Sequence, residues 1–137
     1  MLIDQKLLDQ VSQQAQESPR LRMNHNFHDA PTSPSQRLLN ALEPGTVLPI
    51  HRHRHTSESY VLLRGRIDVM FCDAAGHTTA TFHLDPLMGN YGVQIPRGQW
   101  HTLQVLASGS VIFEAKDGPY TPLAPEDLLV YTIETTK

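Results

Sequence analysis

The sequence has few charged residues, few aromatic residues and almost no cysteine. Charged residues make up 18% of the 137 positions, and 14 acidic against 11 basic residues give a formal net charge of -3. No block of like charges occurs, so the basic surface typical of proteins that bind nucleic acid or anionic membranes is missing. We therefore expect a small-molecule partner, with no nucleic acid and no membrane.

The single cysteine and the lack of long apolar runs indicate the compartment. Cys72 has no partner for an internal disulfide and lies in an apolar run, so we expect an inert buried thiol and a reducing compartment. No run approaches the roughly 20 apolar residues of a membrane-spanning helix. Asp4, Lys6 and Asp9 interrupt the apolar start of the chain, which argues against a secretory leader. We expect a cytoplasmic protein.

At this length a single domain over residues 1–137 is the expectation. Apolar positions three or four residues apart after Asp4 predict a short amphipathic helix within residues 1–19. From Arg20 the period changes to two, and turn signals then separate short apolar runs, which predicts an all-β sandwich or barrel over residues 20–118. Residues 119–137 are expected to form a covering arm.

Histidine is the unusual residue of the sequence. Three of the eight histidines, His51, His53 and His55, occur at alternating positions within five residues. Alternate residues of a strand share a face, so we expect a strand that projects His51 and His53 the same way. A short turn would then start a neighbouring strand at Glu58 and place its carboxylate beside the two imidazoles.

A second histidine-bearing turn lies downstream. The turn at residues 96–98 predicts another strand, of which His101 is the first inward residue. Three imidazoles and one carboxylate converging inside a barrel suit Fe, Mn, Ni, Cu or Zn better than Ca or Mg. We therefore expect one divalent transition metal.

These positions resemble the two sequence motifs of the cupin superfamily. The matching residues are Gly45, His51, His53, Glu58 and Gly65 for the first motif and Pro96, Gly98 and His101 for the second. The second motif departs from the usual pattern at Asn90, where glycine is common, and at Val105, where asparagine is common. The resemblance implies a small antiparallel β-barrel of the cupin (jelly-roll) type. It implies that the metal ligands are His51, His53, Glu58 and His101.

A resemblance over nearly the whole chain is to the WbuC family of single-domain cupin metalloproteins. It is carried by Arg20, Arg22, Asn24, Asn26, His28, Gln36, Arg37, Pro49, Trp100, His101, Glu114, Lys116, Gly118, Pro119 and Tyr120. Members of that family are associated with bacterial surface-polysaccharide gene clusters. The resemblance therefore implies a fold and a biological context, but no reaction.

Further polar residues are candidates for ligand binding and proton transfer. The candidate ligand-binding residues are Arg20, Arg22, Asn24, Asn26, Lys116 and Tyr120, and the candidate proton carriers are Glu114, His28 and His55. Arginines and amides along one strand face suit an anionic or hydroxyl-rich ligand, because the guanidinium fork matches carboxylate and phosphate. The same face is equally compatible with the solvated side of an edge strand. Glu114 and Lys116 would either pair on the surface or lie near the metal.

Three functions are compatible with these residues. The first is a metal-dependent enzyme that acts on a sugar, sugar acid or nucleotide-sugar precursor by isomerisation, epimerisation or oxygenation. The second is a non-catalytic module that binds carbohydrate or carboxylate through the metal, and the third is a purely structural metal. We also expect a homodimer, because an all-β protein must cover its sheet edges, with the N-terminal helix and residues 128–133 at the interface.

Overall fold

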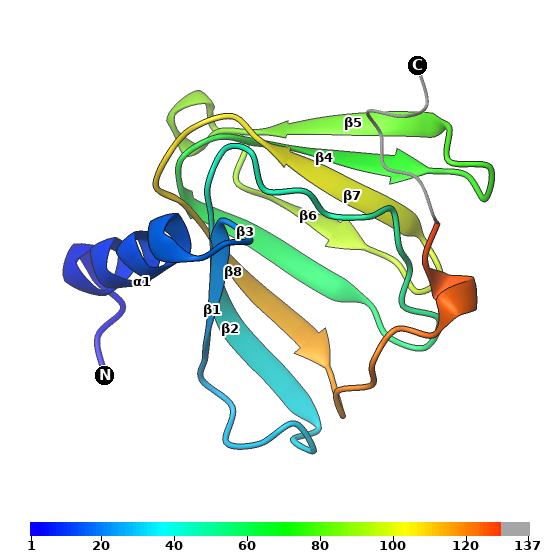
Figure 1. Ribbon diagram of the computed structural model, residues 1–137, viewed down its shortest axis with the longest axis horizontal. Helices are drawn as coiled ribbons and strands as arrows, with labels where there is room; N and C mark the ends of the chain where they lie inside the picture. The colour runs from blue at the N-terminus through cyan, green and yellow to red at the C-terminus, as the bar shows by residue number, and fades with distance from the viewer. Residues whose placement is uncertain (130–137) are drawn as a thin grey trace.

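The computed structural model describes residues 1–129, which form one helix, eight strands and two short 3-10 helices (Figure 1). The elements are α1 (Gln5–Glu17), β1 (Arg22–Asn26), β2 (Ser35–Leu42), β3 (Glu58–Arg64), β4 (Ile67–Cys72), β5 (Thr78–Leu84), η1 (Pro86–Met88), β6 (Gly92–Ile95), β7 (Trp100–Val105), β8 (Ser110–Asp117) and η2 (Pro125–Asp127). The strands form a five-stranded sheet in the order β1-β2-β8-β3-β6 and a three-stranded sheet in the order β5-β4-β7. Each strand pairing is antiparallel, which confirms the expected all-β architecture with a short N-terminal helix.

One apolar core lies between the two sheets. Val69 of β4 and Leu103 of β7 belong to the same buried cluster as Leu62 of β3 and Ile112 of β8. Because side chains alternate along a strand, each of these strands contributes every second residue to the core. The two sheets therefore act as the two layers of a jelly roll.

Helix α1 covers the outer face of the five-stranded sheet, beside β1 and β2 (Figure 1). It begins where the side chain of Asp4 accepts a hydrogen bond from the backbone N–H of Leu7 at 3.0 Å, as an N-cap residue does. Its apolar stripe, which includes Val11 and Ala15, packs on Leu39 of β2. The predicted helix is confirmed. A helix of 13 residues is only marginally stable in isolation, so the packing of its apolar stripe on the sheet stabilises it here.

The alternation of β8 decides which residues reach the functional site. Val111 and Phe113 face α1, whereas Ile112 faces the core between the sheets. Glu114 and Lys116 continue the inward series and line a cavity at the polar end of the core. The inner face of β8 therefore changes from apolar to polar along its length.

A third apolar cluster lies on the outer side of the three-stranded sheet. It contains Ile50, Met70, Cys72 and Trp100, with Leu129 packed against it. Cys72 is a buried free thiol, as the sequence predicts. The expected covering arm is described only as far as Leu129, so most of the apolar tail expected at a dimer interface lies outside the described residues.

Of the helices within residues 1–129, none has the length and hydropathy that crossing a membrane requires.

Candidate metal site and ligand cavity

Three histidines converge at the polar end of the core. His51, His53 and His101 each offer one ring nitrogen, and these three nitrogens lie within 4.8 Å of one another. The ring centroids of His51 and His101 are 4.3 Å apart, and those of His51 and His53 are 5.2 Å apart. These separations allow one metal ion to contact all three imidazoles.

The segment that carries His51 and His53 is not the regular strand that the sequence predicts. His51 forms isolated bridges, exchanging backbone hydrogen bonds of 3.1 and 2.9 Å with His101, and the carbonyl oxygen of His53 accepts one from Gly98 at 2.8 Å. Its backbone groups thus bond to several different segments instead of to one neighbouring strand. Gly98 makes this approach from a tight turn at φ 79°, a conformation that glycine adopts without strain. The alternation of side chains that the motif predicts is nevertheless kept.

Glu58 stands beside the histidines because it is the first residue of β3. Its Oε1 atom lies 2.8 Å from Nε2 of His53 and 3.8 Å from Nζ of Lys116, and its Oε2 atom lies 3.7 Å from Nε2 of His101. Burial acts to raise the pKa of Glu58, but the His53 hydrogen bond and the neighbouring charges outweigh it and lower the pKa to about 2. The carboxylate is therefore ionised, as a metal ligand must be.

Two buried atoms at this point have no hydrogen-bond partner among residues 1–129. They are Oε2 of Glu58 and Nε2 of His101, whose side chains are only 3% and 2% exposed. Unpaired buried polar atoms cost free energy, so a pair of them side by side indicates a group that binds between them. Three imidazoles and one carboxylate fit a divalent transition metal.

Burial keeps the two best-covered imidazoles neutral. It lowers the pKa of His51 to about 3 and also lowers the pKa of His101, with the charge of the neighbouring histidine adding to the effect at His51. Neutral imidazole is the form that ligates metals. Both side chains are therefore ready to bind a metal near pH 7.

A cavity of about 250 Å³ borders the histidine cluster at His51 and His53. It is lined by Arg20, Arg22, Met23, Asn24, Asn40, Leu48, His51, His53, Glu58, Tyr60, Leu103, Glu114 and Lys116. Five of the predicted polar residues therefore line the same cavity as predicted metal ligands: Arg20, Arg22, Asn24, Glu114 and Lys116. Arg20, Arg22 and Asn24 line this cavity, although Arg20 and Asn24 are also exposed to solvent, so their role in ligand binding stays a prediction.

Glu114 is the buried acid of this cavity. Its Oε1 atom accepts a hydrogen bond from the side-chain amide of Asn40 at 2.8 Å. Burial, together with the negative charge of Glu58, raises the pKa of Glu114 to about 7. A carboxyl group with this pKa exchanges protons readily near neutral pH.

Four predicted residues do not line this cavity, and their functional roles stay predictions. Asn26 is exposed at the end of β1, and the Nδ1 atom of His28, beyond that end, accepts the backbone N–H of Arg37 at 3.1 Å. Tyr120 follows β8 and is 54% exposed. His55 lines a different cavity. The physical reason at His28 is that β1 has ended at Asn26, so the period of two no longer directs the side chain.

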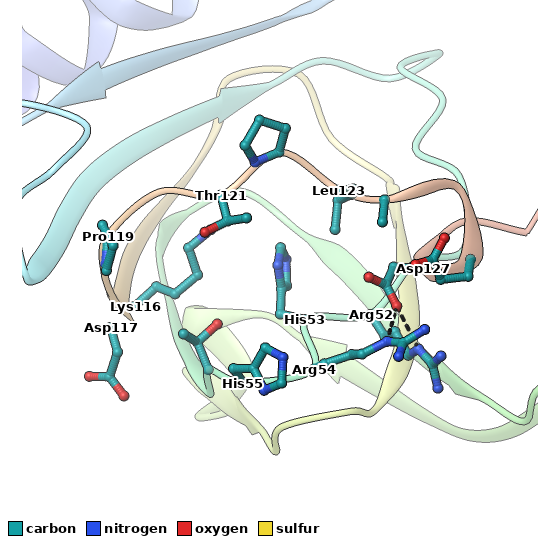
Figure 2. A pocket seen from close by; sticks show the side chains of 14 residues that line it. Arg52, His53, Arg54, His55, Lys116, Asp117, Pro119, Thr121, Leu123 and Asp127 are labelled. Atoms are coloured by element: carbon teal, nitrogen blue, oxygen red, sulfur yellow. Dashed lines mark hydrogen bonds and ion pairs between the residues drawn. The ribbon is translucent and has the colours of Figure 1, made fainter.

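This second cavity, of about 300 Å³, lies beneath the chain that follows β8 (Figure 2). The segment from Pro119 to Asp127 passes over His53, which stands near the centre of the view. His53 and Lys116 line both cavities, so these two side chains form the wall between them. The metal site is therefore bordered by two compartments.

Sequence reasoning missed two cavity residues that carry chemistry. Tyr60 is 6% exposed and lies opposite Glu114 in the pairing of β3 with β8. Asn40 reaches Glu114 from β2 on the other side. Neither residue lies in a motif, and only the spacing of Tyr60 two positions after Glu58 indicated that it faces inward.

Comparison with solved structures shows the cupin fold. The cupin domain of Cnp3 from Schizosaccharomyces pombe aligns with a TM-score of 0.56 and 13% identity, over 70% of this chain and 64% of that chain. The capsular polysaccharide assembling protein CapF from Staphylococcus aureus aligns with a TM-score of 0.64 and 18% identity, over 85% of this chain but only 33% of its own. KdgF from Halomonas sp. aligns with a TM-score of 0.58 and 14% identity, over 73% of this chain and 82% of that chain.

The sequence comparisons give a family but no activity. None of the curated proteins matches the sequence. One family model matches a stretch that includes His51, His53 and Glu58 but ends before His101 and β8. Because the matched residues 3–84 make up more than half of the 137, this chain belongs to the family described as "Domain of unknown function (DUF6016)".

Proposed function

We propose that this protein is a divalent-metal-binding cupin that acts as an enzyme on a small anionic, hydroxyl-rich metabolite. The substrate class is a sugar acid or a nucleotide-sugar precursor, and the context is bacterial surface-polysaccharide biosynthesis. One observation carries the proposal: a single cavity is lined by Glu58, by two of the three clustered histidines, by three cationic side chains and by a buried acid. The similarity of fold to a capsular polysaccharide assembling protein agrees with this context.

The metal site would supply Lewis-acid chemistry. His51, His53, His101 and Glu58 would hold a divalent ion, which would supply Lewis-acid polarisation of a carbonyl or hydroxyl oxygen of a bound molecule. The unpaired Oε2 atom of Glu58 and Nε2 atom of His101 support this assignment.

The cations of the cavity would bind and orient the substrate. The guanidinium of Arg22 is held from one side, where Nη1 donates to the carbonyl oxygen of Val47 at 3.1 Å and to Oγ1 of Thr46 at 3.4 Å. Arg20 lines the same wall, and Lys116 lies across the cavity beside Glu58. A carboxylate or phosphate group placed among them receives charge-assisted hydrogen bonds.

Glu114 favours proton transfer over oxygenation as the reaction. With a pKa of about 7, its carboxylate can take a proton from a carbon next to a carbonyl group, and its acid form can return that proton. When Glu114 returns the proton to the neighbouring carbon, the outcome is an isomerisation. An epimerisation would in addition need a second acid that delivers a proton to the opposite face of the carbon. Asn40 donates a hydrogen bond to Glu114 and would hold its carboxyl group in place, and Tyr60 lies opposite Glu114 in the pairing of β3 with β8.

Deuterium exchange tests this reaction class without knowledge of the product. Protein loaded with Mn²⁺, Zn²⁺ or Fe²⁺ would be incubated in D₂O with a panel of keto-sugars, sugar acids and their nucleotide derivatives. We expect deuterium to enter at a carbon next to the carbonyl group of one panel member, as read by proton NMR and mass spectrometry. Glu114→Gln should lower this exchange by about 10² or more while metal content stays unchanged.

Two control variants separate the parts of the proposal. His53→Ala should lose both metal and exchange, whereas His83→Ala, whose exposed imidazole pairs with Asp68, should lose neither. Exchange that is unchanged in Glu114→Gln would refute the role of this residue. Ligand-dependent melting shifts without exchange in any panel member would favour the non-catalytic binding module.

A further inference from the structure

The metal-ligand segment, residues 50–54, is held from two sides. On one side His51 exchanges backbone hydrogen bonds with His101 of β7. On the other side lies the described part of the C-terminal arm, residues 119–129. The N–H of Leu129 donates to the carbonyl oxygen of Ile50 at 2.9 Å, and the N–H of Arg52 donates to that of Asp127 at 3.1 Å. The arm thus replaces the strand partner that this segment lacks.

One carboxylate also joins the two side chains that flank His53. Oδ1 of Asp127 accepts hydrogen bonds from Nε of Arg52 at 3.0 Å and from Nε of Arg54 at 2.6 Å (Figure 2). Both arginines extend toward Asp127 in Figure 2, whereas His53 points in another direction and belongs to the histidine cluster. Asp127 is therefore bonded to the residue before His53 and to the residue after it.

Arg52 also contacts Trp100, the residue that precedes the third histidine, His101. The guanidinium of Arg52 lies 4.6 Å from the centre of the Trp100 ring, a cation–π distance. Trp100 precedes His101 in β7 and is 8% exposed. The Asp127 contact therefore connects the arm, the metal-ligand segment and β7.

We propose that Asp127 is a positioning residue of the metal site, which makes the C-terminal arm a part of that site. This inference rests on the proposed metal-binding function. An isolated surface ion pair contributes little, but here one carboxylate receives two guanidinium donors while its backbone carbonyl binds Arg52. Metal ligands must be held within about 0.5 Å of their productive positions. Loss of Asp127 would free His53 more than it would unfold the domain.

Glu126 provides a matched control for Asp127. Both carboxylates lie in η2 and line the same cavity, yet in the described chain it is Asp127 that bonds to the two arginines. Asp127→Ala and the milder Asp127→Asn, which keeps the side-chain volume, would be compared with Glu126→Ala. Urea unfolding would verify that each variant is folded.

The test is Co²⁺ binding to the full chain, followed by calorimetry and by the visible absorption of the bound ion. We expect Asp127→Ala to weaken the Co²⁺ Kd by about tenfold and to change the ligand-field bands. Asp127→Asn should fall between it and the wild type, and Glu126→Ala should stay within about twofold. Co²⁺ affinity and spectrum that are unchanged in Asp127→Ala would overturn the proposal.

A metal-free measurement separates failure of this inference from failure of the metal site. Two-dimensional ¹⁵N–¹H NMR of the histidine rings reports the contact of Nε2 of His53 with Glu58. We expect Asp127→Ala to shift the His53 ring signals and Glu126→Ala to leave them in place. A wild type that binds no Co²⁺ would refute the proposed metal function, and unshifted His53 signals in Asp127→Ala would independently refute the positioning role.

Discussion

The Nδ1 atom of His51 lies 2.9 Å from the carbonyl oxygen of Pro49, two residues before it in the chain. The same relationship recurs at His101, whose Nδ1 atom lies 2.9 Å from the carbonyl oxygen of Gln99. A carbonyl oxygen only accepts hydrogen bonds, so Nδ1 carries the proton in both neutral rings. Each ring therefore presents the lone pair of Nε2, and its backbone carbonyl fixes the ring orientation that a metal ligand needs.

Removing one of these rings should abolish the effect of metal on stability. We expect a divalent metal at 100 times its Kd to stabilise the wild type by about 2.7 kcal/mol, and His101→Leu by nothing measurable. Leucine also removes the buried Nε2 atom that has no partner within residues 1–129. Urea unfolding with and without metal gives both values. Equal stabilisation of wild type and variant would contradict the assignment, and His83→Leu should behave as wild type.

Metal-free protein should lose stability in acid because of His51. Burial lowers its pKa from 6.5 to about 3, so the unfolded chain binds more protons than the folded one between these values. The free energy of unfolding should therefore fall as pH drops below about 6.5. His51→Gln should flatten this slope in urea titrations at pH 7, 6, 5 and 4 with a chelator present. An unchanged slope would show that His51 does not cause it.

Glu114 should have the opposite pH effect. Its pKa is raised from 4.5 to about 7, so the folded protein holds this proton more tightly than the unfolded chain does. The resulting stabilisation is complete below about pH 4.5 and is lost as pH rises through 7. Relative to wild type, Glu114→Gln should gain stability between pH 5 and pH 8, by up to about 3 kcal/mol. Gln keeps an acceptor for the amide of Asn40. A difference between variant and wild type that is independent of pH would contradict this.

The helix-covered face should contribute to stability but not to metal binding. Leu39 is fully buried under α1, on the face of β2 that points away from the cavity. We expect Leu39→Ala to cost about 2–5 kcal/mol of unfolding free energy while the metal Kd stays within twofold. Leu87→Ala, at a position that is 96% exposed, should cost less than about 0.5 kcal/mol. A metal affinity that falls together with the stability of Leu39→Ala would show that the two faces are coupled.

Local periodicity and turns predicted the fold class, the helix and the position of Glu58 beside His51 and His53, whereas the ligand set that includes the distant His101 was implied by the resemblance to the cupin motifs. The motif predicted side-chain direction at His51 and His53, although the segment is not a strand. Asn40 and Asp127 were missed because their contacts join residues 74 and 73 positions apart, and no local pattern encodes such pairings. A homodimer and a cytoplasmic location stay predictions.

The cavity takes its groups from two differently constrained parts of the fold. Glu58 lies on β3, which pairs with a strand on each side, whereas Arg22 and Asn24 lie on β1, at the edge of the five-stranded sheet, where a strand pairs on one side only. Substitutions on an edge strand disturb fewer contacts than those on a central one. We therefore expect substitutions in β1 to alter the proposed ligand binding while they leave the proposed metal site intact.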